Sequence, residues 1–424
     1  MSNPLLQTNS FPQFTDIKAE HVVPAIEAII ESNKKSINEL LENIETPTWE
    51  NLILPLDDLD SLLSDAWSPA SHLNSVNPND ELRTAFNACL PKLSAYYTEI
   101  GQNDKLYQAI RKISQSLDFD NYSVAQKKAI TNSLRDFKLS GISLNAEKKE
   151  TYGKLQSRLS ELQSKFSDNT TDATNAWTKH ITNPEELKGI PESSLAMMAN
   201  NAKSQDKEGY YFDLQSPYII AVLTYCENRE LRQEISIAYN TRSSQEGPLA
   251  GQFDNTEIIK ELLEKRLELS KLLDFENYAE YSLATKMASS TDEVVDFLSA
   301  LVEQSKPQGE VEFARLEKFA QDEYGVDKLA AWDIAFYSEK MKQKLFDISK
   351  EELRAYFPED KVLEGLFKIT SLLFDIEVTP ETNFNSYHPD LQLYKVSRDK
   401  KTIAHFYIDL YARPENRPGA RMAR

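Results

Sequence analysis

The chain has 424 residues, of which 40% are hydrophobic and 27% charged, a composition typical of a folded globular protein with room for two domains. Its formal net charge of −19 would repel nucleic-acid phosphates and anionic lipid headgroups, which argues against both as partners. Only 11 glycines stand against 18 prolines, a balance that disfavours glycine-rich loops and favours long helices bounded by prolines.

The cysteines and the first residues indicate a cytoplasmic protein. Cys89 and Cys226 lie far apart and in no CxxC pattern, which favours reduced and buried thiols. The N-terminal residues have neither the basic region nor the apolar stretch of a signal peptide. The densest apolar run, from Ile219 to Leu223, is far shorter than the ~20 residues that a membrane-spanning helix needs. We therefore expect a cytoplasmic location and no membrane contact.

Capping signals predict helices along most of the chain. The Thr46-Pro47 pair has the order of an N-cap followed by proline at the first helical position, and Asn183-Pro184 repeats this order. Glutamates follow Ser290 and Ser349 at the three-residue spacing of a capping box. These signals predict a mainly α-helical fold.

The clearest helix is predicted from about Asn145 to about His180. Apolar residues recur in it at intervals of three and four, and so form one stripe: Tyr152, Leu155, Leu159, Leu162 and Phe166. A continuous helix of this extent would be ~54 Å long. We expect it to be the spine of a large helical domain or a strut between two lobes.

Strand signals are few. One candidate is residues 209–214, which end near Pro217. A hairpin is predicted near the C-terminus, with alternating residues in 391–396 and 402–412 around a polar stretch. In its second strand one face would carry Ala404, Phe406, Ile408 and Leu410, and the other His405, Tyr407, Asp409 and Tyr411.

The residues alone contain no recognisable catalytic motif. The compact zinc-hydrolase motif HExxH is absent, because none of the five histidines is followed by glutamate and no two lie within five residues of each other. His405 and Asp409 would be ~13 Å apart along one strand, too far for one metal ion. No serine-nucleophile elbow or phosphate-binding loop occurs either. From the residues alone we expect no catalytic and no metal-binding side chains.

Ordered blocks along nearly the whole chain nevertheless resemble one protein family. They include residues 20–26, 48–52, 67–76, 134–142, 283–288, 332–337 and 406–413. Together they resemble the thimet-oligopeptidase family of zinc metallopeptidases. The resemblance implies a mainly helical, two-lobed protein with a deep, narrow channel between the lobes. Such a protein would cleave short peptides and exclude folded ones.

None of the family's catalytic residues can be placed on this chain. The family binds zinc through HExxH and a later glutamate, and all of these positions lie beyond the point where the sequence ends. The resemblance therefore predicts the N-terminal portion of a zinc metalloendopeptidase, truncated before its zinc motif, which binds no zinc and is inactive alone. We expect an N-terminal helical domain in residues 1–205 and the beginning of the catalytic domain in residues 206–424.

The resemblance also places the C-terminal hairpin in the small sheet that lines the family's cleft. Its polar face supplies the candidate substrate-binding residues His405, Tyr407 and Tyr411, and the alternative is that this face packs against other helices. The expected partners are short peptides or a separately encoded catalytic half. A second hypothesis is a non-enzymatic helical subunit that binds peptides or complements such a half.

Overall fold

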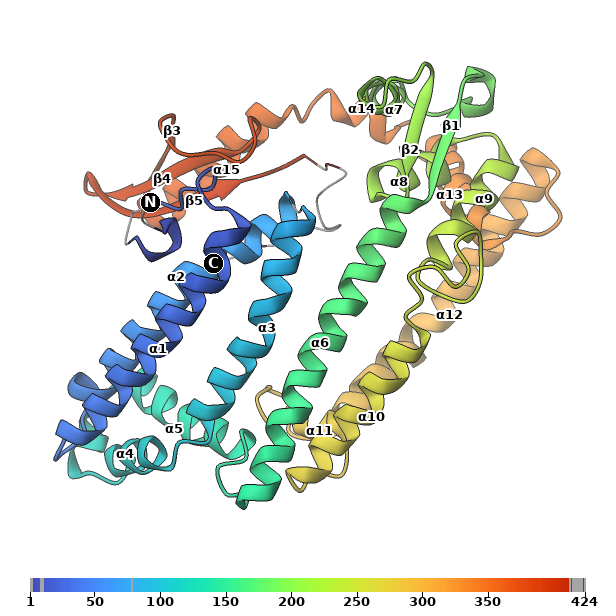
Figure 1. Ribbon diagram of the computed structural model, residues 1–424. Helices are drawn as coiled ribbons and strands as arrows, with labels where there is room; N and C mark the ends of the chain where they lie inside the picture. The colour runs from blue at the N-terminus through green and yellow to red at the C-terminus, as the bar shows by residue number, and fades with distance from the viewer. Residues whose placement is uncertain (1–2, 8–10, 78, 412, 414–421, 423–424) are drawn as a thin grey trace.

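A computed structural model describes residues 3–7, 11–77, 79–411, 413 and 422. These residues form a series of helices and two small antiparallel sheets (Figure 1). The mainly α-helical fold expected from the capping signals is confirmed.

The first helices make one layered unit. Its elements are η1 (Pro4–Leu6), α1 (Ala19–Asn43), η2 (Trp49–Ile53), α2 (Leu54–Val76), α3 (Asp80–Gly101), α4 (Asp104–Ser114), η3 (Leu117–Asn121) and α5 (Val124–Leu139). Residues of α1, α2 and α3, such as Ile26, Leu63 and Cys89, share an apolar core. A second core beneath it joins η2, α4 and α5.

The predicted cap at Thr46 is wrong by two residues. Thr48 is the N-cap of η2, where its hydroxyl accepts from the Asn51 backbone N–H at 3.2 Å and its own N–H donates to Asn51 Oδ1 at 2.7 Å. This reciprocal pair satisfies two backbone groups that would otherwise lack partners. Pro47 consequently lies before the helix rather than inside it.

The long helix α6 (Ala146–Ala176) runs between α3 and α10 (Thr256–Leu272) (Figure 1). Asn145 caps it by accepting from the Lys148 N–H at 2.9 Å. Four residues of the predicted stripe, Tyr152, Leu155, Leu159 and Leu162, are buried, and they pack against Ile258, Leu262 and Leu269 of α10. The fifth, Phe166, is 38% exposed. The helix therefore serves as a spine between two helical layers.

The predicted end of this helix is wrong. The backbone becomes extended at Trp177, and Thr178–Ile181 form strand β1. β1 pairs with β2 (Tyr210–Asp213), which lies in the predicted strand, so that His180 stands opposite Tyr211. The expected domain boundary at 205/206 falls between these paired strands, and that division remains a prediction.

A third core surrounds this small sheet. It is built by η4 (Pro184–Leu187), α7 (Glu192–Ser204), α8 (Ser216–Tyr225) and α9 (Arg229–Asn240). Trp177, Phe212, Ile219 and Ile235 lie at its centre. Asn183 caps η4 as predicted, by accepting from the Glu185 N–H at 3.2 Å.

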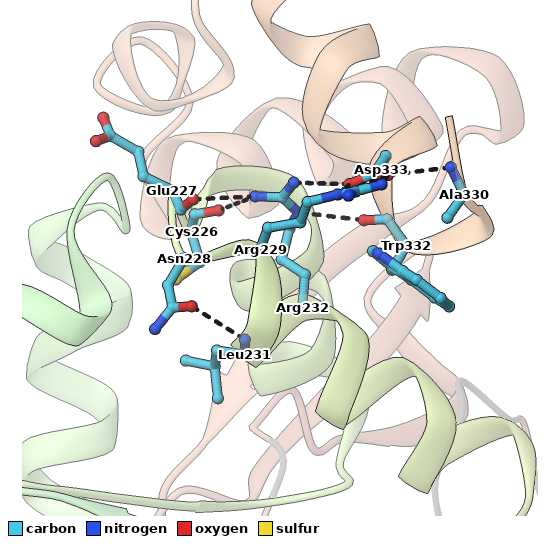
Figure 2. Close-up of polar contacts among 9 residues, drawn as sticks. All are labelled: Cys226, Glu227, Asn228, Arg229, Leu231, Arg232, Ala330, Trp332 and Asp333. Atoms are coloured by element: carbon cyan, nitrogen blue, oxygen red, sulfur yellow. Dashed lines mark hydrogen bonds and ion pairs between the residues drawn. The ribbon is translucent and has the colours of Figure 1, made fainter. Parts of the chain in front are cut away.

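A buried ion pair joins α9 to the start of α13 (Ala331–Phe346) (Figure 2). Arg232 Nη2 donates to Asp333 Oδ1 at 2.8 Å, and Arg229 Nη2 donates to Asp333 Oδ2 at 2.6 Å. Arg232 also donates to the Cys226 carbonyl at 2.7 Å. Because Arg232 and Asp333 are fully buried, this pairing fixes α13 against the third core.

The remaining helices are α11 (Tyr278–Leu283), α12 (Thr291–Tyr324), α14 (Lys350–Arg354) and α15 (Glu359–Phe374). Ser290 and Ser349, the serines of the two predicted capping boxes, are the N-caps of α12 and α14. Ser290 Oγ accepts from the Glu293 N–H at 3.1 Å, and Ser349 Oγ accepts from the Glu352 N–H at 3.0 Å. The box at Ser349 is complete, because the Ser349 N–H donates back to Glu352 Oε2 at 2.9 Å. At Ser290 only the cap is confirmed, since Glu293 Oε2 accepts from the Ser289 N–H at 2.7 Å instead.

The C-terminal sheet has the order β3 (Glu377–Glu381), β4 (Gln392–Arg398), β5 (Lys401–Ile408), all antiparallel. Asp399 and Lys400 connect β4 to β5 with φ of 50° and 63°, as a tight hairpin turn requires. The predicted hairpin is thus present. Leu391, just before β4, joins the core of α1, α2 and α3, so the C-terminal sheet lies beside the N-terminal helices (Figure 1).

Candidate functional site

The polar face of β5 is contacted by the N-terminal segment, residues 11–17. The His405 ring meets Phe11 edge to face, with centroids 4.8 Å apart. Tyr407 meets Phe14 at 5.7 Å. The Thr15 N–H donates to Asn385 Oδ1 at 2.8 Å, which joins the same segment to the loop between β3 and β4.

The three candidate substrate-binding residues have different surroundings. His405 is exposed beside Phe11. Tyr407 is half-buried, burial raises the pKa of its phenol, and its hydroxyl has no hydrogen-bond partner among the described residues. Tyr411 is exposed, and its hydroxyl donates to Glu359 of α15, a carboxylate that raises the pKa of the phenol. The strand ends at Ile408, so the predicted alternation does not reach Tyr411.

A polar network lies behind this face, where α2, the β3–β4 loop and the end of β5 meet. The Tyr387 hydroxyl donates to Asp409 Oδ2 at 2.8 Å. His72 Nε2 lies 3.1 Å from the Tyr387 hydroxyl oxygen. Since the hydroxyl hydrogen is already donated to Asp409, His72 Nε2 is the donor in this second bond. Arg413 donates to both oxygens of Asp409, with Nη1 2.9 Å from Oδ1.

The charges in this network stabilise one another. Burial alone would raise the pKa of Asp409, but the hydrogen bonds from Arg413 and Tyr387 outweigh it and hold this pKa below its usual value. Burial and the neighbouring carboxylate both raise the pKa of Tyr387. The network therefore contains an ionised carboxylate, a guanidinium and a neutral phenol at neutral pH.

The network also reaches the third core. The Arg413 carbonyl accepts from Gln215 Nε2 at 3.1 Å, and Gln215 is the buried N-cap residue of α8. Asp213 lies two residues before Gln215, and its Oδ1 accepts a hydrogen bond from the Gln215 backbone N–H at 2.9 Å. This bond favours the ionised carboxylate, but burial outweighs it and raises the pKa of Asp213 to about 6. The end of β5 is thus tied both to α2 and to the start of α8.

The described residues do not fit the zinc ion that the family resemblance implies. No group of three His, Cys, Asp or Glu side chains able to hold a metal is found within the described ranges. His72 is bonded to Tyr387, and His388 Nδ1 accepts from the Asp390 N–H at 3.2 Å. The Arg413 guanidinium, 3.5 Å from His388 Nδ1, would further oppose a cation at that nitrogen. None of the described helices combines the length and the apolar character of a membrane-spanning segment.

Comparisons with known proteins agree with this architecture. The model of the Neurolysin/Thimet oligopeptidase N-terminal domain matches residues 26–149, and that of Peptidase family M3 matches residues 222–424. Over 423 residues the chain is 48% identical to Oligopeptidase A of Haemophilus influenzae and 45% identical to that of Escherichia coli. The chain belongs to peptidase family M3. The resemblance inferred from the ordered blocks is therefore confirmed.

This M3 chain matches only part of each relative. The two bacterial alignments cover 100% of the chain and 62% of the relative. The Probable cytosolic oligopeptidase A of Arabidopsis thaliana is 35% identical over 433 residues, which cover 99% of the chain and 61% of the relative. The chain thus spans about three fifths of the length of the curated relatives it matches.

Sequence reasoning missed the polar network of this M3 chain. His72 lies in one of the blocks that carry the family resemblance, and Asp409 and Arg413 lie in another. The position of these three residues in blocks that resemble the family was the sequence signal that could have pointed to the network. Tyr387 lies outside every block, and only the fold brings it between His72 and Asp409.

Proposed function

We propose that this chain forms the N-terminal helical domain and the first part of the catalytic domain of an oligopeptidase A-like zinc metalloendopeptidase that cleaves short peptides in the cytoplasm. The observation that carries the proposal is 48% and 45% identity to two bacterial Oligopeptidase A proteins across 100% of this chain. The two family matches, to an N-terminal domain and to Peptidase family M3, support the division into two parts.

On this proposal the described residues bind and position the peptide but do not hold the zinc. Support comes from the lack of a metal-holding cluster within them and from the part of the relatives that the chain does not cover. The chain alone is then inactive, and zinc binding belongs to that uncovered part.

The candidate peptide-contacting surface is the polar face at the end of the C-terminal sheet, with His405, Tyr407 and Tyr411. The exposure of His405 and Tyr411 supports this role, whereas the half-buried Tyr407 would support the surface from behind. The net charge of −19 favours basic peptides over acidic ones.

The second candidate is a non-enzymatic subunit that binds peptides or complements a separately encoded catalytic half. It is favoured by the same lack of a metal-holding cluster among the described residues. The two candidates differ in whether this chain can serve as part of a working peptidase.

Hydrolysis by a fusion protein tests the first candidate. The 424 residues would be joined to the part of Escherichia coli Oligopeptidase A that follows its matched region, and a quenched fluorescent peptide would report cleavage. We expect chelator-sensitive turnover. A folded fusion that binds zinc but cleaves no peptide would contradict the proposal and favour the second candidate.

A further inference from the structure

Helix α12 carries an apolar stripe that the described residues leave uncovered. The exposed Phe297, Leu298 and Leu301 follow the half-buried Val294 at the three- and four-residue spacing of one helix face. Phe297 is 63% exposed and Leu298 53%. Every side chain in residues 295–315 is exposed, and the helix buries only Leu316 and Ala320 near its far end, against α13.

Helix α15 repeats this arrangement beside the C-terminal sheet. One face of the helix packs on the sheet through Phe367, whose ring lies 4.8 Å from that of Tyr394. Another face carries Val362, Leu366, Ile369 and Leu373, again at helical spacing. These four side chains are exposed, Ile369 to 58% and Leu373 to 69%.

The same pattern elsewhere in the chain is buried. α6 has apolar residues at equivalent intervals, and Tyr152, Leu155, Leu159 and Leu162 are all covered by neighbouring helices. An amphipathic helix normally buries its apolar face, and a contiguous exposed apolar surface marks an interaction site. Within the described part of the chain, the α12 and α15 stripes therefore lack the covering helices that the α6 stripe has.

The family comparison bears on what would cover these two stripes. Both stripes lie within residues 222–424, the region matched by Peptidase family M3. The bacterial relatives contain further polypeptide, since the chain covers only 62% of their length. Since residues 26–149 match an N-terminal domain model, we infer that this further polypeptide follows the matched region.

We propose that the α12 and α15 stripes are the docking surface for the polypeptide that follows the matched region in the oligopeptidase A relatives. The inference rests on the proposed function and adds the residues that hold the two parts together. Apolar contact gives this interface most of its free energy, so a charge introduced into either stripe weakens it.

Co-expression provides the test, because the partner then does not have to fold alone. The affinity-tagged 424-residue chain would be produced together with the part of Escherichia coli Oligopeptidase A that follows its matched region. Two double variants carry charges in the stripes, Leu298→Glu with Leu301→Glu and Leu366→Glu with Ile369→Glu. The control is Leu117→Glu with Val124→Glu, two apolar residues that are 98% and 86% exposed outside the stripes.

We expect a one-to-one complex with the wild-type chain and with the control, and about a tenfold or greater loss of co-purified partner with each stripe variant. Circular dichroism would show that all variants keep their helices. Absence of a wild-type complex would overturn the proposal, as would full retention by both stripe variants. A self-associated dimer of the chain alone that the stripe variants abolish would assign the stripes to a second copy and also overturn it.

The test separates docking from the proposed function. A complex that forms and depends on the stripes but cleaves no peptide would leave the docking surface standing and contradict the peptidase. Cleavage by the covalent fusion, together with failure of every co-expressed pair to associate, would contradict docking alone.

Discussion

Arg232 on α9 donates to Asp333 on α13 across 2.8 Å, and neither side chain has more than 1% of its surface exposed. Asp333 also accepts from Arg229 and from the Ala330 backbone N–H, so its carboxylate is saturated with donors (Figure 2). Burial by itself opposes this charge, but these hydrogen bonds outweigh burial and lower the pKa of Asp333. Residues about a hundred positions apart are thereby held together.

Replacing Asp333 with asparagine should destabilise the fold strongly. The change leaves Arg232 buried without a countercharge, which costs about 3–5 kcal/mol when one partner of a buried pair is removed. Urea unfolding followed by circular dichroism measures the loss. The control is Asp322→Asn, which breaks an exposed pair with Lys318 and should cost less than about 0.5 kcal/mol. Equal effects of the two substitutions would show that the buried pair does not hold α13 in place.

Asp213 should make stability fall as the pH rises. Its pKa of about 6 in the folded chain lies above the usual unfolded value of about 3.9, so the folded state binds its proton more tightly. The stabilising contribution of this proton to the free energy of unfolding is complete below about pH 4, and it is lost as the pH rises through about 6.

Asp213→Asn keeps the acceptor for the Gln215 N–H and removes this titration. At pH 7.5 the variant should be more stable than wild type by about 2–3 kcal/mol, and at pH 3.5 the two should be nearly equal. Urea midpoints across this pH range provide the comparison. A difference between the two proteins that does not change with pH would contradict the assignment.

Two tyrosines beside Phe14 provide a matched pair. Tyr387→Phe removes the hydroxyl that joins His72 to the ionised Asp409, and should cost about 1.5–3 kcal/mol. Tyr407→Phe removes a buried hydroxyl without a partner among the described residues, and should be neutral or stabilising by up to about 1 kcal/mol. Thermal and urea unfolding of both variants would reveal the order. The reverse order would mean that the network does not stabilise this end of the molecule.

His405→Ala should weaken peptide binding. If the exposed imidazole contacts peptide, its removal should raise the Kd for a labelled basic peptide about fivefold, or roughly 1 kcal/mol. Fluorescence anisotropy with the 424-residue chain measures this. His180→Ala is the matched control, because His180 is also exposed but lies in the other sheet. Unchanged affinity of the His405 variant would remove His405 from the candidate surface.

Local patterns in the sequence were enough to predict most of the α6 stripe, the helix caps at Ser290 and Ser349, and the C-terminal hairpin. Each of these depends on residues within one or two turns, or on the two-residue period of a strand. The errors also arose locally. Thr46 and Thr48 both carry a capping hydroxyl, and only the bond from Asn51 selects Thr48. The end of α6 depended on the pairing of β1 with β2, which no local signal in 145–180 reveals.

The surroundings of the candidate site could not be predicted, because they depend on contacts between residues that are more than 300 positions apart in the sequence. His72 and Tyr387 are 315 positions apart, and Thr15 and Asn385 are 370 apart. Alternation correctly placed His405 and Tyr407 on one face of β5. It could not show that Phe11 and Phe14 would lie against that face.

Hydrolysis of a quenched fluorescent peptide by the purified 424-residue chain tests the central claim most directly. That claim is that this chain supplies the scaffold and peptide contacts of an M3 peptidase without a zinc site of its own. The assay would be run with added zinc, with a chelator, and beside the fusion to the remainder of the Escherichia coli relative. The account predicts no turnover by the chain and chelator-sensitive turnover by the fusion. Chelator-sensitive turnover by the chain alone would contradict it, because the chain would then build a metal site.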